Sequence, residues 1–247
     1  NALHLAQNSD MNILTLPKTI DNDVWGTDVC FGFDTATQIA TDAIDRIHST
    51  ASSHQRVMLV EVMGHNTGWI AAAAGLAGGA DVVLLPELPY SVDAVIDTVV
   101  ERKRSGKRFS IVAFAEGALS APEAVRQAQA AEKKKSKKSM LPAPHPEMSL
   151  SLRLTRQIEE GSGLETRLTA LGHVMRGGTP TAEDRTLATV LGSEAARLLA
   201  KGGSGVMVGM RGQSPVHVEL AEVAGKRRSV PLDHPWIQTL RRLNICL

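Results

Sequence analysis

The sequence PKTIDND at residues 17–23 follows a short apolar run, Met11 to Leu16, and precedes a segment with helical spacing from about Thr35 to Ile47. The apolar run predicts a buried strand, so the order is strand, polar loop, helix, which is the first half of a βαβ unit. Ligands of open parallel sheets bind just beyond the carboxyl ends of the strands, where such loops lie. This loop would place a lysine, a threonine hydroxyl and two carboxylates at that position.

The side chains of this loop suit a phosphoryl-transfer site, although they also suit an ordinary turn. Asp21 can take a proton from a substrate hydroxyl. Asp23 can hold a hydrated Mg²⁺, which prefers one or two carboxylates together with substrate phosphates. Lys18 can act as a point charge on a phosphate. Because Asp, Asn and Thr are also common turn formers, an isolated D-N-D fits either interpretation.

Strands and helices alternate over most of the chain. Ser91 and Thr181 are predicted N-caps of two of the helices, and a last short helix should begin at Asp233. This alternation predicts an α/β fold with largely parallel sheets and flanking helices. The predicted strands are 56–62, 81–85, 109–115, 167–174 and 205–210, with 217–223 as a possible hairpin partner of the last; the predicted helices are 69–79, 91–104, 149–160 and 182–201.

Composition narrows the class of protein. Of the 247 residues, 43% are hydrophobic but only 3% are aromatic, so the core must be aliphatic. The net charge of +1 gives no reason to expect nucleic acid or a membrane as a partner. The lysine-rich run 133–138 predicts a solvated helix end and loop, with an anion-binding patch as the alternative.

The cysteines and the chain start give two further expectations. Cys30 and Cys246 lie far apart and do not form a disulfide framework, so we expect reduced thiols in a cytoplasmic protein. We find no signal peptide and no apolar run that could span a bilayer. The chain opens at Asn1 within a predicted helix and without a methionine, so we expect residues upstream of it.

Four blocks of sequence, in the same order, resemble the phosphofructokinases. They are PKTIDND with GTD at 26–28 and FGFDTA at 31–36, then EVMG at 61–64, AEG at 115–117 and LGHVMRGGTP at 171–180. The resemblance implies one phosphofructokinase domain over residues 1–247, truncated at its N-terminus. It implies two similar, interleaved α/β lobes, between which the chain crosses more than once, with the site in the cleft between them.

The resemblance also implies the reaction, which is transfer of a phosphoryl group to the 1-hydroxyl of fructose 6-phosphate in glycolysis. Asp21 would be the general base, a role that contributes about 10²–10⁴-fold in rate. Thr19 would bind the transferring phosphoryl group, and Asp23 would support Mg²⁺ indirectly. Most of the remaining catalysis would be positioning and charge stabilisation.

The resemblance further implies a set of sugar-phosphate ligands. Arg56 and Arg167 match positions that reach across from a neighbouring subunit, which implies a homo-oligomer, a dimer or tetramer. Arginine suits this role because its planar fork matches phosphate oxygens. The phosphate-binding residues would be Arg56, Arg167, His173 and Arg176, with Glu116 on sugar hydroxyls and the backbone of Met63 and Gly64 on the sugar.

Two positions bear on the phosphoryl donor and on the class of function. His65 stands where many family members carry arginine; it either meets transition-state charge or caps the following helix. Lys18 is typical of pyrophosphate-dependent members but also occurs in ATP-dependent ones, and we favour ATP over pyrophosphate. The chain as it stands lacks much of the donor half of the site and is expected to be inactive alone. The alternative function is a non-catalytic, sugar-phosphate-binding regulatory subunit.

Overall fold

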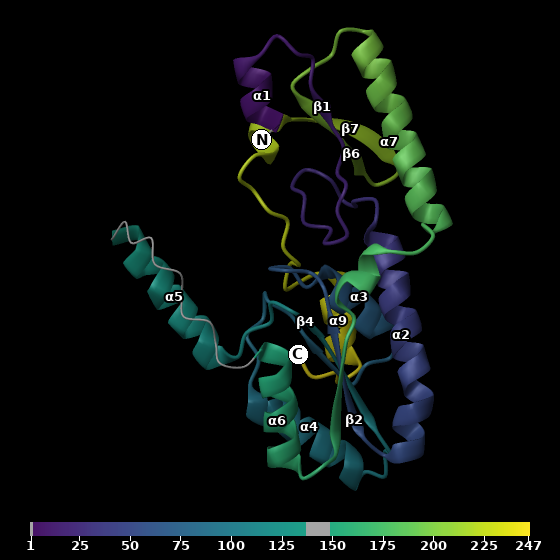
Figure 1. Cartoon of the computed structure of the whole chain (residues 1–247), viewed down its shortest axis with the longest axis vertical. Helices are drawn as coiled ribbons and strands as arrows, with labels where there is room; N and C mark the ends of the chain where they lie inside the picture. The colour runs from purple at the N-terminus through teal and green to yellow at the C-terminus, as the bar shows by residue number, and fades with distance from the viewer. Residues whose placement is uncertain (1, 137–148) are drawn as a thin grey trace. The chain divides into compact units, whose positions relative to one another are not determined.

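A computed structural model of the chain describes residues 2–136 and 149–247. The chain forms two compact units: unit 1 contains residues 1–39 and 173–229, and unit 2 contains residues 40–172 and 230–247. Figure 1 colours the chain by residue number, and each unit combines colours from distant parts of the sequence. The chain therefore passes from one unit to the other after residues 39, 172 and 229.

The sheet of unit 2 consists of four parallel strands in the order β3-β4-β2-β5. Because all four run in the same direction, the loops that follow β2, β4 and β5 leave the sheet at one edge, which is where parallel sheets bind ligands. The strands are aliphatic and mostly buried, as expected of a parallel sheet covered on both faces. Their bounds are Val57–Val62 (β2), Val82–Leu84 (β3), Ser110–Ala115 (β4) and Thr166–Ala170 (β5).

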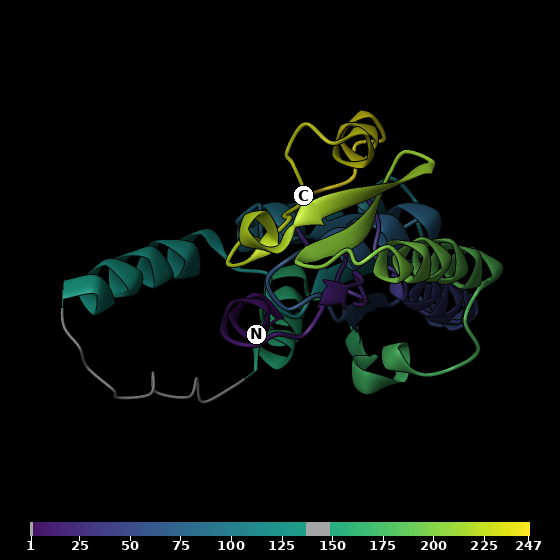
Figure 2. The same cartoon turned by 90° about the horizontal axis from the view of Figure 1, so that it is seen from above.

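Helices cover this sheet, and their ends follow the sequence signals. The Ser91 hydroxyl accepts a hydrogen bond from the N–H of Ala94 at 3.3 Å, which confirms the predicted N-cap of α4. Leu154 and Ile158 of α6 pack with Leu59 and Phe114 in the core. The helices packed around the sheet are α2 (Phe33–His54, which begins in unit 1), α3 (Trp69–Ala77), α4 (Val92–Arg104), α6 (Leu150–Ser162) and α9 (Pro235–Arg242). Helix α5 (Ala121–Ser136) extends away from the sheet in both views (Figures 1 and 2).

Unit 1 has a smaller, mixed sheet in the order β1-β6-β7. Strand β1 is parallel to β6, and β6 forms an antiparallel hairpin with β7. Helix α7 runs beside β6 and β7 in both views and packs Leu187 and Leu191 against Val208 and Met210 (Figures 1 and 2). The elements are α1 (Ala2–Asn8), β1 (Leu14–Thr15), α7 (Ala182–Ala200), β6 (Val206–Arg211), β7 (Ser214–Glu219) and α8 (Leu220–Val223).

Four of the five strand pairings described are parallel, so the predicted α/β class with largely parallel sheets is confirmed. Three predicted strands are wrong in extent. The predicted hairpin partner of β6 at 217–223 is β7 at Ser214–Glu219, and Leu220–Val223 forms helix α8 instead. The run Met11 to Leu16 is not a buried strand, because only Leu14–Thr15 pairs and Met11 is 56% exposed. The predicted strand 167–174 ends at Ala170, and His173 and Arg176 lie instead in a 3₁₀ helix, Gly172–Arg176. Gly172 has a φ of +50°, which breaks the extended backbone before these residues.

Three remaining expectations concern the membrane, the thiols and the lysine run. Among the residues with described structure, no helix is long and apolar enough to cross a bilayer. Both cysteines are free thiols, and burial raises the pKa of Cys30 to about 11. Lys137, Lys138 and the loop after them lie outside the described residues, so the prediction of a solvated lysine run stays a prediction.

Candidate active site

The predicted site residues are divided equally between the two units, and each set is described within its own unit. Unit 1 carries the loop at residues 17–32 and the segment at residues 173–180, whereas unit 2 carries the loops after β2 and β4 and the start of β2 and β5. The unit 1 set is Lys18, Thr19, Asp21, Asp23, His173 and Arg176; the unit 2 set is Arg56, Met63, Gly64, His65, Glu116 and Arg167.

The loop at residues 17–32 is shaped by Asn22. This residue is only 3% exposed and has a φ of +55°, a conformation that asparagine tolerates better than most residues. Its side-chain oxygen accepts a hydrogen bond from the N–H of Cys30 at 2.9 Å, which closes the loop on itself. In the D-N-D triplet, therefore, the turn-forming role belongs to Asn22, and the aspartates on either side of it are half-buried.

Asp21 and Thr19 are tied together within this loop. The Thr19 hydroxyl accepts a hydrogen bond from the backbone N–H of Asp21 at 3.1 Å, an ordinary local motif of threonine. The Oδ1 atom of Asp21 is shielded from solvent. The loop thus fixes the backbone from which the predicted base projects and couples it to the predicted phosphoryl ligand.

Asp23 meets two arginines, Arg227 and Arg228, that lie outside the four sequence blocks. Its Oδ2 atom lies 3.6 Å from Nε of Arg227, and its carbonyl oxygen accepts the N–H of Arg228 at 2.8 Å. The Arg228 guanidinium also donates to the carbonyl of Asn22 at 3.2 Å, and burial lowers the pKa of Arg228. The run Lys226-Arg227-Arg228 was the available sequence signal, but 200 residues of chain separate it from the loop it holds.

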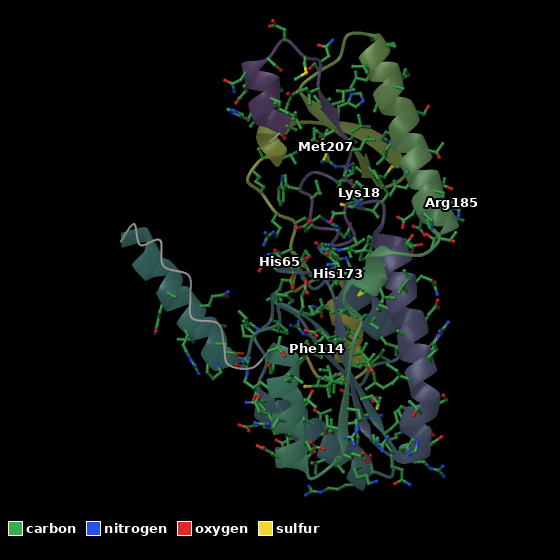
Figure 3. All side chains as sticks on the ribbon, in the orientation of Figure 1. Lys18, His65, Phe114, His173, Arg185 and Met207 are labelled. Carbon is green, nitrogen blue, oxygen red and sulfur yellow. The ribbon has the colours of Figure 1, made fainter. Side chains whose placement is uncertain are left out.

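A cavity of about 350 Å³ in unit 1 brings Lys18 and Arg176 together with a third cation, Arg185 (Lys18 and Arg185 are labelled in Figure 3). The remaining walls are mainly apolar. A volume of about 350 Å³ lies within the range of small-molecule pockets. His173, which precedes Arg176 in the same 3₁₀ helix, does not line this cavity. The other lining residues are Ile20, Phe31, Gly32, Thr35, Met175, Gly177, Gly178, Pro180, Asp184 and Ala188.

In unit 2, the loops after β2 and β4 interlock. A β-carbon at Gly64 would lie 2.4 Å from the carbonyl oxygen of Thr67, and one at Gly117 would lie 1.7 Å from the carbonyl oxygen of His65. Both positions therefore require glycine: Gly64 because its own loop folds back on it, and Gly117 because the loop after β2 lies directly against it. Glu116 accepts the N–H of His65 at 3.0 Å, while Met63 is 7% exposed.

The capping interpretation of His65 is wrong. Helix α3 begins after Gly68, which has no side-chain cap, and the Gly68 N–H donates to the Glu87 carboxylate at 3.0 and 3.1 Å. His65 instead adopts a φ of +49° at the exposed tip of the loop, and its backbone N–H binds Glu116. The imidazole is not needed for this contact and remains available for a ligand.

Arg56 and Arg167 lie at the opposite edge of the unit 2 sheet from these loops. Arg56 directly precedes β2, and Arg167 pairs with Met58 near the start of β5. A strand as long as β2, with six residues, separates the two edges by about 20 Å at 3.3 Å per residue. The structure therefore does not bring these two arginines together with Met63, Gly64, His65 and Glu116.

These two arginines share an acidic neighbour. Arg56 Nε lies 2.8 Å from Glu165, and Arg167 also forms an ion pair with Glu165. The hydrogen bond from Arg56 is the main reason that the pKa of Glu165 is lowered. Arg167 is half exposed and lies 3.8 Å from Glu159 as well. The arginines thus form one cationic group, held by carboxylates, at the amino end of the sheet.

Comparisons with known proteins agree with these motifs. The family profile described as phosphofructokinase matches residues 1–199. The ATP-dependent 6-phosphofructokinases of Propionibacterium freudenreichii and Spirochaeta thermophila are 50% and 49% identical over 98% of this chain, which spans 68% and 64% of their lengths. The related protein of Bacteroides thetaiotaomicron, an ATP-dependent 6-phosphofructokinase 3, is 47% identical, and the chain spans 63% of it.

Solved structures give the same answer for the fold. The pyrophosphate-dependent phosphofructokinase of Marinobacter aquaeolei superposes with a TM-score of 0.75 over 100% of this chain and 64% of its own, at 22% identity, which shows the fold alone. The phosphofructokinase of Saccharomyces cerevisiae has a TM-score of 0.70 and 34% identity over 86% of this chain and 26% of its own. The chain therefore belongs to the phosphofructokinase family.

Proposed function

We propose that the complete protein carrying this sequence transfers the γ-phosphoryl group of ATP to the 1-hydroxyl of fructose 6-phosphate, giving fructose 1,6-bisphosphate and ADP. The observation that carries the proposal is the loop at residues 17–32, in which a buried Asn22 holds the Asp21 and Asp23 carboxylates on either side of a tight turn. The names of the relatives at 47–50% identity support both the reaction and the donor.

The loop residues take separate parts in the transfer. The Asp21 carboxylate accepts the proton of the sugar hydroxyl while the hydroxyl oxygen bonds to the γ-phosphorus and the bond from that phosphorus to the β–γ bridging oxygen breaks. The Thr19 hydroxyl, held two residues away by the Asp21 N–H, hydrogen-bonds the moving phosphoryl group. Lys18 neutralises charge on the phosphates.

The acidic residues of the loop fit Mg²⁺, which would offset phosphate charge when bound. Among residues 2–136 and 149–247, no group of three or more His, Cys, Asp and Glu side chains could enclose a metal ion. Mg²⁺ takes one or two carboxylates and fills its other positions with water and substrate phosphates, so a single loop carboxylate would suffice. Asp23 would act through water, because its carboxylate already faces Arg227.

We propose sugar-phosphate roles for the remaining predicted residues within each unit. In unit 1, Arg176 and His173 contact its phosphate. In unit 2, Glu116 accepts from its hydroxyls, and the backbone of Met63 and Gly64 contacts the ring. The exposed His65 side chain would meet developing phosphate charge where many relatives carry arginine.

Arg56 and Arg167 are proposed to serve the site of a neighbouring subunit. Their position at the amino edge of the β2–β5 pair, about 20 Å from the loops after β2, supports this assignment, because they cannot reach a ligand held by those loops of the same chain. The active protein is then a homo-oligomer in which each site contains Arg56 and Arg167 of another subunit.

Steady-state assays of the complete protein with fructose 6-phosphate and either ATP or pyrophosphate test the proposal. We expect turnover with ATP and much less with pyrophosphate. Turnover only with pyrophosphate would overturn the donor assignment. Binding of fructose 6-phosphate without turnover on either donor would instead indicate a regulatory subunit. Lys18→Gly should leave ATP use in place, whereas a gain of ATP use would show that the lysine excludes the nucleotide.

A further inference from the structure

Asp184, in the first turn of α7, binds the start of a different helix. It is 4% exposed, and its carboxylate accepts three hydrogen bonds: from the Gly32 N–H at 2.7 Å, the Thr35 N–H at 2.8 Å and the Thr35 hydroxyl at 2.5 Å. Gly32 directly precedes α2 and Thr35 lies in its first turn, where N–H groups have no partner within the helix. The carboxylate therefore caps α2 from α7, across about 150 residues of sequence.

The same contact holds the start of α7. The Thr35 hydroxyl oxygen accepts the N–H of Thr181 at 3.1 Å, and the Thr181 hydroxyl accepts the N–H of Asp184 at 3.3 Å. A negative charge is favourable at a helix N-terminus, and here a single carboxylate lies at two of them. Hydrogen bonds therefore fix the starts of α2 and α7 to each other, through Gly32, Thr35, Thr181 and Asp184.

Each of these two helices is preceded by predicted site residues. Gly32 ends the loop that carries Lys18, Thr19, Asp21 and Asp23. The segment that carries His173 and Arg176 leads through Pro180 to Thr181 and α7. Asp184, Gly32 and Thr35 also line the cavity that contains Lys18 and Arg176. The anchor therefore lies where both functional segments are attached.

We propose that Asp184 is a positioning residue that sets the base-bearing loop and the phosphate-binding arginine relative to each other. The proposal rests on the proposed function. Both carboxylate oxygens of Asp184 accept hydrogen bonds from protein groups, so Asp184 acts through Gly32 and Thr35 on one side and, through the Thr35 hydroxyl, on Thr181 on the other. A displacement of about 1 Å in such a site can cost on the order of 10²-fold in rate.

Asp184→Asn tests the proposal in the complete protein. The asparagine amide keeps the shape of the side chain but turns one acceptor into a donor that faces an N–H. We expect kcat per folded enzyme to fall about 10- to 100-fold, with a rise in KM for fructose 6-phosphate of about tenfold. Glu183→Gln, which removes an exposed charge from the same helical turn, is the matched control and should leave both constants unchanged.

Thr35 supplies a second pair of variants in case Asp184→Asn folds poorly. Thr35→Val removes the hydroxyl that bridges Asp184 and Thr181, whereas Thr35→Ser keeps it. We expect Thr35→Val to shift kcat and KM in the same directions and Thr35→Ser to restore them. A variant that loses only thermal stability, with both constants per folded enzyme unchanged, would overturn the proposal.

Amide hydrogen exchange separates this proposal from the proposed function. Asp184→Asn should speed exchange at Gly32 and Thr35 and also through the loop at residues 19–24. If the parent protein lacks phosphoryl transfer, the proposed function fails, and the exchange data still test the anchor. If the parent protein is active and exchange changes only at Gly32 and Thr35, the function stands and the positioning role fails.

Discussion

The backbone N–H of His65 donates a hydrogen bond to Oε1 of Glu116 at 3.0 Å, which joins the loops that follow neighbouring parallel strands. Directly beside this bond, the backbone of Gly117 approaches the carbonyl of His65 so closely that no side chain fits. The EVMG and AEG motifs are thus two halves of one structure, in which a carboxylate is oriented by the partner loop. Because the contact uses the main chain of residue 65, it tolerates either histidine or arginine there.

Gly117→Ala should disrupt both loops. The β-carbon would lie 1.7 Å from the His65 carbonyl, so the backbones must separate, at a cost of about 1–3 kcal/mol of unfolding free energy. Chemical denaturation measures this cost. Gly192→Ala, within α7 and with no atom within 4 Å of the added carbon, should instead stabilise by about 0.5–1 kcal/mol. Equal effects of the two changes would contradict the close approach.

Asp21→Asn should abolish turnover in the complete protein and leave affinity for fructose 6-phosphate within about tenfold, since a base lost from the transition state lowers kcat rather than binding. The expected loss in kcat is about 10²–10⁴-fold. Single-turnover assays and equilibrium binding separate the two quantities. Asp10→Asn, at an exposed position, is the control. Near-normal turnover of Asp21→Asn would remove Asp21 from the role of base.

Arg176→Ala should raise KM for fructose 6-phosphate far more than it lowers kcat, because a phosphate remote from the reacting hydroxyl is bound similarly in the ground and transition states. Initial-rate kinetics over a wide range of sugar phosphate measure the split. Arg197→Ala, an exposed arginine of α7 that pairs with Glu194, provides a matched loss of charge in the same unit. An unchanged KM in Arg176→Ala would exclude this residue from phosphate binding.

Glu61→Gln should make the protein more stable at neutral pH. Burial of this β2 residue raises the pKa of its carboxyl; the hydrogen bond from Ser151 opposes the shift, and Glu116 adds to it. A raised pKa means that the folded state favours the protonated form. The contribution of this carboxyl to the free energy of unfolding is therefore fully present below about pH 4.5 and is lost as the pH rises through the folded pKa.

Thermal unfolding from pH 4 to pH 8 measures this effect. The advantage of Glu61→Gln should be largest near pH 7 and shrink toward pH 4. Glu123→Gln is the control with the opposite sign. Burial raises the pKa of Glu123, but hydrogen bonds from Ser120 and the charge of Arg153 lower it by more, so the net pKa lies below its usual value. That variant should be destabilised at neutral pH. If the melting temperatures of Glu61→Gln and the parent protein differed by the same amount at every pH, a raised pKa of Glu61 would be contradicted.

Hybrid oligomers test whether Arg56 and Arg167 act on a neighbouring subunit. At fructose 6-phosphate concentrations far below the raised KM of Arg167→Ala, both Asp21→Asn and Arg167→Ala should be nearly inactive alone. When the two variants are mixed and allowed to exchange subunits, sites that combine an intact Asp21 with an intact Arg167 should restore about a quarter of wild-type activity. Activity no greater than the sum of the separate variants would show that Arg167 serves its own chain or no site.

Local sequence patterns predicted the elements that depend on neighbouring residues. The cap residues Ser91 and Thr181 begin α4 and α7 as expected, because a side-chain oxygen reaches an N–H only three residues along the chain. The strand at residues 11–16 failed for the opposite reason. Apolar residues indicate a strand only if a partner pairs with them, and in the described structure β6 pairs with Leu14 and Thr15 alone among them.

The sequence alone determined the family, the aliphatic α/β class and the identity of the polar loop at residues 17–23, because these depend on residue type, order and short-range spacing. Only the tertiary structure decided what holds that loop. Arg228 on the Asn22 and Asp23 carbonyls, Asp184 on the start of α2, and the approach of Gly117 to His65 join residues that are 52 to 206 positions apart. Hydrophobic periodicity reports which face of an element is buried and carries no information on which distant backbone it meets.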